Sequence, residues 1–147
     1  MYPNHKFGMK KNMKSIYLRL TATSDLFKKI ELTGDNEIAI TTGCVYDDQT
    51  ELILYLAKRD DAFILTDKGR TRTFMDKIFE LKEPDVIKNI VAAADYYEIS
   101  TRNKQLSLKI ADKEESFEYW KESFCEGILK MVLCIGFLDA MKIFYTK

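Results

Sequence analysis

Carboxylate side chains are the groups in this sequence that could carry out chemistry. Asp48, Glu51 and Asp67 flank two apolar runs that we expect to be strands, so their oxygens could meet in one cleft and hold Mg²⁺, as in metal-dependent nucleases. The acid-x-Lys pattern of those nucleases is missing, because Asp67 and Lys68 are adjacent and would point to opposite faces of a strand. We therefore favour the alternative that these acids, together with Asp47, are turn residues that hydrogen-bond their own backbone.

Basic side chains cluster at Lys68, Arg70 and Arg72, directly after the turn signal of residues 66–69. Near the N-terminus of a helix such a cluster could contact a phosphate. The alternative that we favour is a solvated surface. The whole chain carries 23 basic and 23 acidic residues, and this zero net charge predicts neither a nucleic-acid partner nor binding to an anionic membrane.

Several common kinds of catalytic and cofactor site are missing from the sequence. The single histidine, His5, argues against Ser-His-Asp and Cys-His catalysis and against histidine-rich metal sites. No glycine-rich nucleotide motif is present, so we expect no cofactor. Cys44, Cys125 and Cys134 are too widely spaced for a zinc site, and we expect all three to be buried thiols in a reducing compartment. The first residues lack the apolar core of a signal peptide, which predicts a cytoplasmic protein.

The elements that would position these groups are organised around a predicted hairpin. Its strands are the apolar runs 52–56 and 62–65, joined by polar residues 58–61. The first run is apolar at every position, so we expect a central strand with both faces covered by helices. Residues 37–42 alternate and predict a preceding strand, and residues 43–50 predict a loop or bulge.

The N-terminal part of the chain allows two interpretations. Residues 1–12 resemble a flexible leader. From there, apolar residues spaced by three or four predict one helix over residues 14–30, with Gly34 as its C-terminal cap. The alternative splits this segment into two strands, 16–20 and 27–32, because Thr21, Thr23 and Ser24 weaken a helix.

Helical patterns dominate the second half of the sequence. We predict helices over 72–81, capped by Thr71 or Thr73, and over 84–97, where Pro84 suits the first helical position. Residues 99–101 and 105–110 predict a small hairpin. Residues 113–145 predict one long helix, and its section 128–138 is apolar on almost every side.

This long apolar helix is either the spine of the domain or part of an interface with a second copy. In the second case a homodimer would form through residues that recur every three or four positions. The predicted interface residues are Trp120, Phe124, Ile128, Met131, Ile135, Leu138 and Phe144. The flanking charges and the short apolar run argue against a membrane span.

The predicted architecture is one α+β domain over residues 13–147 of the 147-residue chain. It contains a small antiparallel sheet around a central hairpin, packed with several helices and with a long C-terminal helix. No linker or repeat in the sequence divides the chain into two domains.

A short set of residues resembles a known family. The order Thr41-Thr42, Asp47-Asp48, the strand 52–56 and then the segment 63–71 is similar to a bacterial and phage family known as domain of unknown function 1828. Thr42-Gly43 stands where the family has Pro-Phe, and Lys68 replaces an acid of its turn, which counts against an acidic site here. The resemblance implies a cytoplasmic α+β domain associated with bacterial genomes and mobile elements, and it implies no activity.

Two functions follow as hypotheses. The first is a non-catalytic protein-interaction module, in the setting that the resemblance implies: a phage or mobile-element accessory protein that binds and blocks a host defence or regulatory protein. The second is a metal-dependent phosphodiesterase or nuclease that uses Asp48, Glu51 and Asp67, with Lys68 or Arg70 guiding the phosphate. Neutral charge, small size and the absence of the usual catalytic sets favour the first hypothesis.

Overall fold

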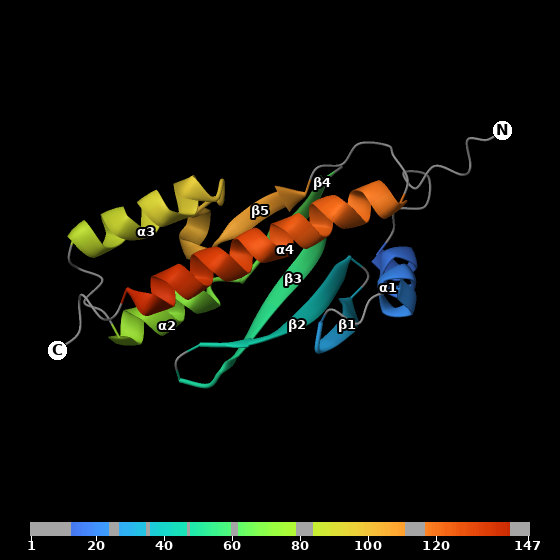
Figure 1. Cartoon of the computed structure of the whole chain (residues 1–147), viewed down its shortest axis with the longest axis horizontal. Helices are drawn as coiled ribbons and strands as arrows, with labels where there is room; N and C mark the ends of the chain where they lie inside the picture. Colours follow the sequence, from blue (N-terminus) through green and yellow to red (C-terminus); the bar gives the residue numbers. More distant parts are fainter. Residues whose placement is uncertain are drawn as a thin grey trace.

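The computed structural model describes residues 13–23, 27–34, 36–46, 48–59, 62–78, 84–110 and 117–141. The fold is α+β, as predicted, with an antiparallel sheet and a long C-terminal helix (Figure 1). The helices are α1 (Met13–Thr23), α2 (Arg70–Ile78), α3 (Pro84–Tyr96), the 3-10 helix η3 (Arg102–Lys104) and α4 (Phe117–Ala140). The strands are β1 (Lys29–Gly34), β2 (Glu37–Val45), β3 (Glu51–Arg59), β4 (Ala62–Thr66) and β5 (Ser107–Ile110).

The sheet has the order β1-β2-β3-β4-β5, and every pair of neighbouring strands is antiparallel. The predicted hairpin is confirmed as β3 and β4, with Leu56 opposite Leu65. β3 is the middle strand, as its apolar run predicted. After β4 the chain leaves the sheet, forms α2 and α3, and returns as β5 beside β4 (Figure 1).

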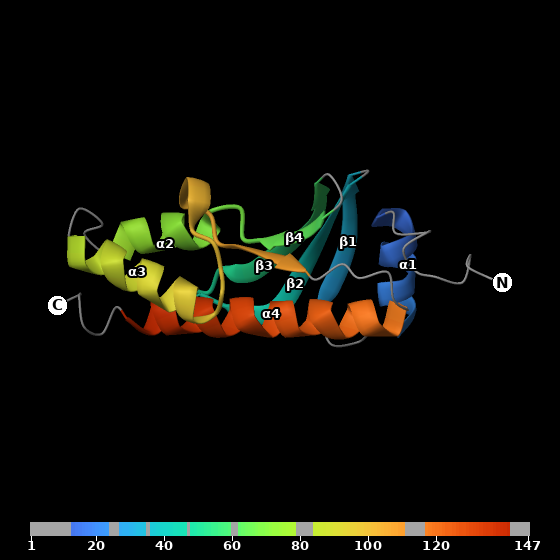
Figure 2. The same ribbon diagram turned by 90° about the horizontal axis from the view of Figure 1, so that it is seen from above.

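Within the described ranges, a helix covers only one face of the sheet. Leu52, Leu54 and Leu56 of β3 are buried, whereas Ile53 and Tyr55 on the opposite face are partly exposed. Figure 2 shows α4 along one face, α1 beyond the β1 edge, and α2 and α3 at the other end of the molecule. For the described residues, the prediction of helices on both faces of β3 is therefore wrong, because this strand alternates in burial although its sequence is continuously apolar.

The N-terminal segment combines the two predicted alternatives. Residues 13–23 form α1, and Met13, Ile16 and Leu20 are fully buried in the core. Residues 29–34 form the edge strand β1, so neither the single helix nor the pair of strands is right. Gly34 ends β1 at the turn into β2 and caps no helix. The spacing of apolar residues by three or four continues past residue 23 because Phe27 and Ile30 also pack against the core. Ile30 does so from the strand β1 and not from a helix. The predicted leader, residues 1–12, lies outside the described residues.

Two other strand predictions need correction. β2 continues to Val45, and a bulge between Thr41 and Val45 carries Gly43 at φ +92°, which suits a residue without a Cβ. The predicted small hairpin is reduced to one bridge between Ser100 and Ser107, because residues 107–110 pair with β4 instead and form β5. The predicted helices are confirmed as α2 and α3, although α2 begins earlier, at Arg70.

Helix α4 packs against the sheet at a position without a side chain. A Cβ at Gly127 would lie 2.7 Å from Cδ1 of Ile110 and 3.0 Å from Cδ1 of Leu65, so only glycine allows this close approach. The described part of the helix spans 24 residues, and the remainder of the predicted range 113–145 lies outside the described segments except for Met141. Of the helices in the described ranges, none is both long enough and apolar enough to cross a lipid bilayer.

Candidate functional site

Asp67 lies at the junction between β4 and α2 and is completely buried. Its Oδ1 accepts hydrogen bonds from the backbone N–H groups of Gly69 and Leu106, at 2.8 and 3.0 Å, and its Oδ2 accepts one from Thr71 at 3.1 Å. Lys68 and Gly69 in the turn have φ of +55° and +81°. Asp67 therefore caps the start of α2, a role that we had predicted for Thr71 or Thr73, and the turn interpretation of this acid is confirmed.

Tyr46 and Thr71 form a buried hydrogen bond next to this capped turn. The hydroxyl of Tyr46 lies 2.8 Å from the Oγ1 of Thr71, inside the protein. The Tyr46 ring packs on Phe74, with 4.9 Å between ring centroids. Burial raises the pKa of Tyr46 to about 12, although its hydrogen bond with Thr71 acts in the opposite direction. Tyr46 was not predicted as a site residue, because a lone aromatic residue after a strand does not indicate a particular function.

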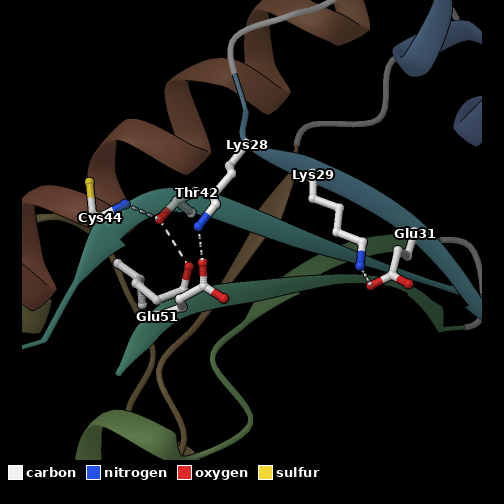
Figure 3. Close-up of polar contacts among 7 residues, drawn as sticks. Lys28, Lys29, Glu31, Thr42, Cys44 and Glu51 are labelled. Atoms are coloured by element: carbon white, nitrogen blue, oxygen red, sulfur yellow. Dashed lines mark hydrogen bonds and ion pairs between the residues drawn. The ribbon is translucent and has the colours of Figure 1, made fainter. Parts of the chain in front are cut away.

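Asp48 and Glu51, the other two candidate metal ligands, contact different partners from those of Asp67. Asp48 Oδ1 accepts the N–H of Thr50 at 2.9 Å, and its hydrogen bonds with Thr50 lower its pKa. Glu51 forms an ion pair with Lys28 at 2.6 Å, and this pairing lowers the pKa of Glu51 (Figure 3). The described residues contain no group of three His, Cys, Asp or Glu side chains that could hold a metal ion. The predicted triad is therefore wrong as a metal site, because each of its carboxylates has its own partner.

The strands around Glu51 carry further polar contacts on their surface. Figure 3 shows Lys29 beside Glu31, with 3.4 Å between the charged atoms. The hydroxyl of Thr42 donates to the carbonyl oxygen of Leu52 at 2.9 Å and accepts the N–H of Cys44 at 3.2 Å. The two hydrogen bonds of Thr42 stabilise the bulged end of β2, whereas the Lys29–Glu31 pair lies on the exposed edge strand β1.

The three predicted phosphate-contacting residues have different surroundings. Lys68 forms an ion pair with Glu37 at 2.6 Å, and its Nζ lies 4.2 Å from the centre of the Tyr55 ring. Arg70 lines a cavity of about 180 Å³ together with Lys68. Arg72 lines a separate and much smaller hollow of about 10 Å³. The structure therefore brings together Lys68 and Arg70 but not Arg72.

The cavity of about 180 Å³ is also lined by a third cation, Lys77, which was not among the predicted phosphate-contacting residues. Arg70, Thr73, Phe74 and Lys77 all line the cavity, and they occupy positions i, i+3, i+4 and i+7 of α2. Residues with this spacing share one face of a helix. The spacing was therefore available in the sequence, but the boundary that we predicted for α2 began at residue 72 and left Arg70 out of the helix.

The predicted interface residues on α4 belong to the protein's own core. Trp120 and Phe124 stack with 5.2 Å between ring centroids, and Phe63 of β4 meets Trp120 edge to face at 5.4 Å. The six described members of the predicted interface are all buried: Trp120, Phe124, Ile128, Met131, Ile135 and Leu138. This set is therefore corrected, because these side chains are buried inside the domain; the seventh member, Phe144, lies outside the described residues.

The opposite side of α4 exposes large apolar side chains. Leu129 is 56% exposed, Leu133 is 48% exposed and Phe137 is 54% exposed. We call this set the α4 outer face. The apolar section 128–138 is therefore not enclosed on every side by the described part of the chain, and its cover by a second copy stays a prediction.

The three cysteines differ in exposure, which corrects the prediction that all are buried. Cys44 is exposed, Cys125 is partly exposed and Cys134 is buried. All three are free thiols. Burial raises the pKa of Cys134 to about 11, with the charge of Asp67 acting in the same direction.

These features define an α+β domain in which an antiparallel sheet carries one long covering helix, with a basic cavity at one end and an exposed apolar helix face. Comparisons with family models, with curated proteins and with solved structures find no match to the chain. The resemblance to domain of unknown function 1828 stays a prediction.

Proposed function

We propose that this protein is a non-catalytic protein-interaction module that binds its partner through the α4 outer face. The observation that carries the proposal is the exposure of Leu129, Leu133 and Phe137, each about half accessible to solvent. Their spacing of four residues aligns them along one side of the helix. Contiguous exposed apolar side chains of this kind mark contact surfaces, and a helix with such a stripe suits an apolar groove or another helix.

The anchoring of α4 supports this proposal. The opposite side of the helix is held in the core by Ile128, Met131 and Leu138, so the outer face is a rigid surface that loses little conformational entropy on binding. Next to Phe137, Gly136 is exposed and a Cβ there would have no atom within 4 Å. This open position would let a side chain of the partner approach the helix backbone.

The charges along α4 favour a particular kind of partner. Glu118, Glu122 and Glu126 are exposed on the N-terminal half of the same side of the helix, whereas the C-terminal half is apolar. A surface with an apolar centre and lysine or arginine residues along one edge would complement both halves. A second copy of the chain, paired antiparallel through Leu129, Leu133 and Phe137, is the other occupant that the experiment below distinguishes.

We also propose a cellular location and a biological role for the protein. We place the protein in the cytoplasm, where its free thiols, including the exposed Cys44, would stay reduced. The sequence resemblance over residues 63–71 supports a phage or mobile-element accessory protein that blocks a host defence or regulatory protein. The competing phosphodiesterase hypothesis has lost its support, because Asp48, Glu51 and Asp67 have separate partners.

The experiment compares the natural chain with a Leu129→Ser, Leu133→Ser, Phe137→Ser variant. Tagged proteins are used for affinity capture from lysate of the natural host, and their masses in solution are measured by sedimentation. A matched control replaces two exposed apolar residues of other helices, Leu18→Ser and Val91→Ser. The proposal predicts that one near-stoichiometric partner, or the dimer, is lost in the triple variant and kept in the control. Equal capture and equal mass for all three proteins would refute it.

A further inference from the structure

We propose that the cavity formed by α2 and the β2–β3 connection binds a phosphate group, either as inorganic phosphate or as a small phosphate monoester. We call it the α2 cavity. Its volume is about 180 Å³, and its charged lining consists of Lys68, Arg70, Lys77 and Asp48. None of its lining residues belongs to α4, so this inference is independent of the proposed interaction surface.

Two of the three cations are available to a ligand. Within the described part of the chain, neither Arg70 nor Lys77 forms an ion pair or a hydrogen bond through its charged group. Lys68 is different, because its Nζ is held by Glu37 at 2.6 Å. Arg70 is partly buried, so its charge is desolvated more than that of an ordinary surface arginine. Asp48 interacts electrostatically with Lys77, although the two form no ion pair. A ligand in the α2 cavity would therefore meet two cations without ion-pair partners among the described residues, Arg70 and Lys77, and a third, Lys68, whose charge Glu37 offsets.

The single carboxylate of the α2 cavity is already engaged. Asp48 accepts the N–H of Thr50 at 2.9 Å, which ties it to the β2–β3 connection. Among the described residues, the α2 cavity is lined by three cations and by Asp48, and Glu37 pairs with Lys68 beside it, which leaves an excess of one positive charge. Such an excess in a concave site attracts a divalent anion more strongly than a monovalent one.

The shape and the neutral lining of the α2 cavity also fit a compact anion. Thr73 lines it and is exposed, so its hydroxyl can donate to ligand oxygens, whereas the Thr50 side chain is hydrogen-bonded to Asp48. Below them, Tyr46 and Phe74 are buried and pack together, which gives the cavity a fixed floor. The Tyr46 hydroxyl is hydrogen-bonded to Thr71, so the ligand would rely on Arg70, Lys77 and Thr73.

Phosphate is the anion that matches these properties best. A phosphate monoester carries about −1.5 to −2 charges near neutral pH and three acceptor oxygens. Arginine presents a planar set of donors that can bind two phosphate oxygens at once, and lysine adds a point charge. A carboxylate ligand would supply one charge and two oxygens, which leaves part of this site unused. The start of α2 contributes little, because the carboxylate of Asp67 already accepts its N–H groups.

The test titrates the full chain with inorganic phosphate, O-phosphoserine and adenosine monophosphate, with acetate as the monovalent control. Binding is followed by amide chemical shifts and by calorimetry. We expect a millimolar or tighter dissociation constant for at least one phosphate compound, and shifts centred on Arg70, Thr73 and Lys77. Preference for inorganic phosphate would define an ion site, and preference for an ester would define a site for the esterified molecule. Either result supports the proposal; shifts that are absent, or that acetate reproduces, would overturn it.

Substitutions sharpen the test. Arg70→Gln and Lys77→Gln should each weaken phosphate binding about tenfold, because each removes a charge-assisted contact. Asp48→Asn should strengthen binding several-fold, since it removes the one carboxylate among the described lining residues of the α2 cavity and keeps an oxygen for the Thr50 N–H. Lys109→Gln, on the exposed side of β5, is the matched control and should change nothing. Melting temperatures verify that every variant is folded. If Lys109→Gln weakened binding as much as Arg70→Gln, the attraction would be non-specific and the proposal would fail.

Discussion

The buried carboxylate of Asp67 accepts the backbone N–H of Leu106, 39 positions later in the chain, over 3.0 Å. The same carboxylate caps α2 through Gly69 and Thr71. One side chain therefore joins the start of a helix to the segment that leads into β5. This relationship explains why an acid is kept at a completely buried position, where an unpaired charge would be costly.

Replacing Asp67 tests this structural role. We expect Asp67→Ala to lower the free energy of unfolding by about 3 to 5 kcal/mol, because it leaves buried N–H groups without acceptors. Asp67→Asn should lower the free energy of unfolding by less, since its amide oxygen can still accept hydrogen bonds from Gly69 and Leu106. Some loss remains, because the NH₂ group would face the N–H of Thr71. Urea denaturation measures both. An alanine variant as stable as the natural chain would contradict the capping role.

The two glycines of α4 provide a matched pair of substitutions. Gly127→Ala would bring a Cβ within 2.7 Å of Ile110, whereas the same change at Gly136 meets no atom within 4 Å. In a helix, alanine is favoured over glycine by about 1 kcal/mol. We therefore expect Gly136→Ala to raise the free energy of unfolding by about 1 kcal/mol.

Crowding should outweigh this gain at Gly127. Overpacking a core costs about 1 to 3 kcal/mol, so after the helical gain of about 1 kcal/mol Gly127→Ala should lower the free energy of unfolding by up to about 2 kcal/mol. Parallel denaturant titrations compare the two variants. Equal effects at the two positions would mean that α4 does not approach the sheet as closely as the structure has it.

Alkaline pH should destabilise the protein through Tyr46. Its pKa is raised to about 12 in the folded state by burial, against about 10 for a tyrosine in an unfolded chain. Folded Tyr46 therefore keeps a proton that the unfolded chain releases, and the stability that Tyr46 contributes is complete below pH 10 and is lost as the pH rises from about 10 to 12. Cys134, whose pKa burial raises to about 11, adds a separate loss that begins at lower pH. The loss should reach about 2 to 3 kcal/mol.

Unfolding measured at several pH values detects this effect. In Tyr46→Phe the extra alkaline slope should disappear, although the variant loses the hydrogen bond with Thr71, worth about 1 kcal/mol at neutral pH. Tyr96→Phe is the control, because Tyr96 is 80% exposed. A full slope in Tyr46→Phe would assign the alkaline loss to other groups.

The thiols should react in the order of their exposure. We expect Cys44 to react first with Ellman's reagent at pH 8, followed by Cys125, whose pKa burial raises. Cys134, with a pKa of about 11, should react only when the protein unfolds, because about a thousandth of it would be thiolate at pH 8 even if the reagent could enter. Cys44→Ser should remove the fast phase. A fast phase that survives this change would require one of the other two thiols to be accessible.

Sequence reasoning succeeded where local patterns are strong. The central hairpin, the helix that begins at Pro84 and the long C-terminal helix were all predicted, because alternation, an N-terminal proline and a repeated spacing of three or four act within a few residues. It failed at residues 14–30, where helical spacing runs across α1 into β1. The spacing of Phe27 and Ile30 reflects contact with the core and not the backbone conformation.

The candidate site was predicted only in part. Lys68 and Arg70 were identified from their position after a turn, and the turn role of Asp67 was anticipated. Lys77 was missed, although its spacing from Arg70 is that of one helix face, because the start of α2 depends on Asp67 and was placed two residues too late. The turn roles of Asp48 and Asp67 were predicted, since each accepts a backbone N–H two residues later. The ion pair of Glu51 with Lys28 could not be predicted, because the two residues are 23 positions apart.

By itself, the sequence determined the central hairpin and the helices α3 and α4, and that β3 lies at the centre of the sheet. Only the tertiary structure decided which side of α4 is covered. Ile128 and Leu129 are both apolar neighbours in sequence, yet the first is 6% exposed and the second is 56% exposed. The physical reason is that burial depends on which surfaces meet, and the sheet that meets α4 is assembled from strands far from it in sequence.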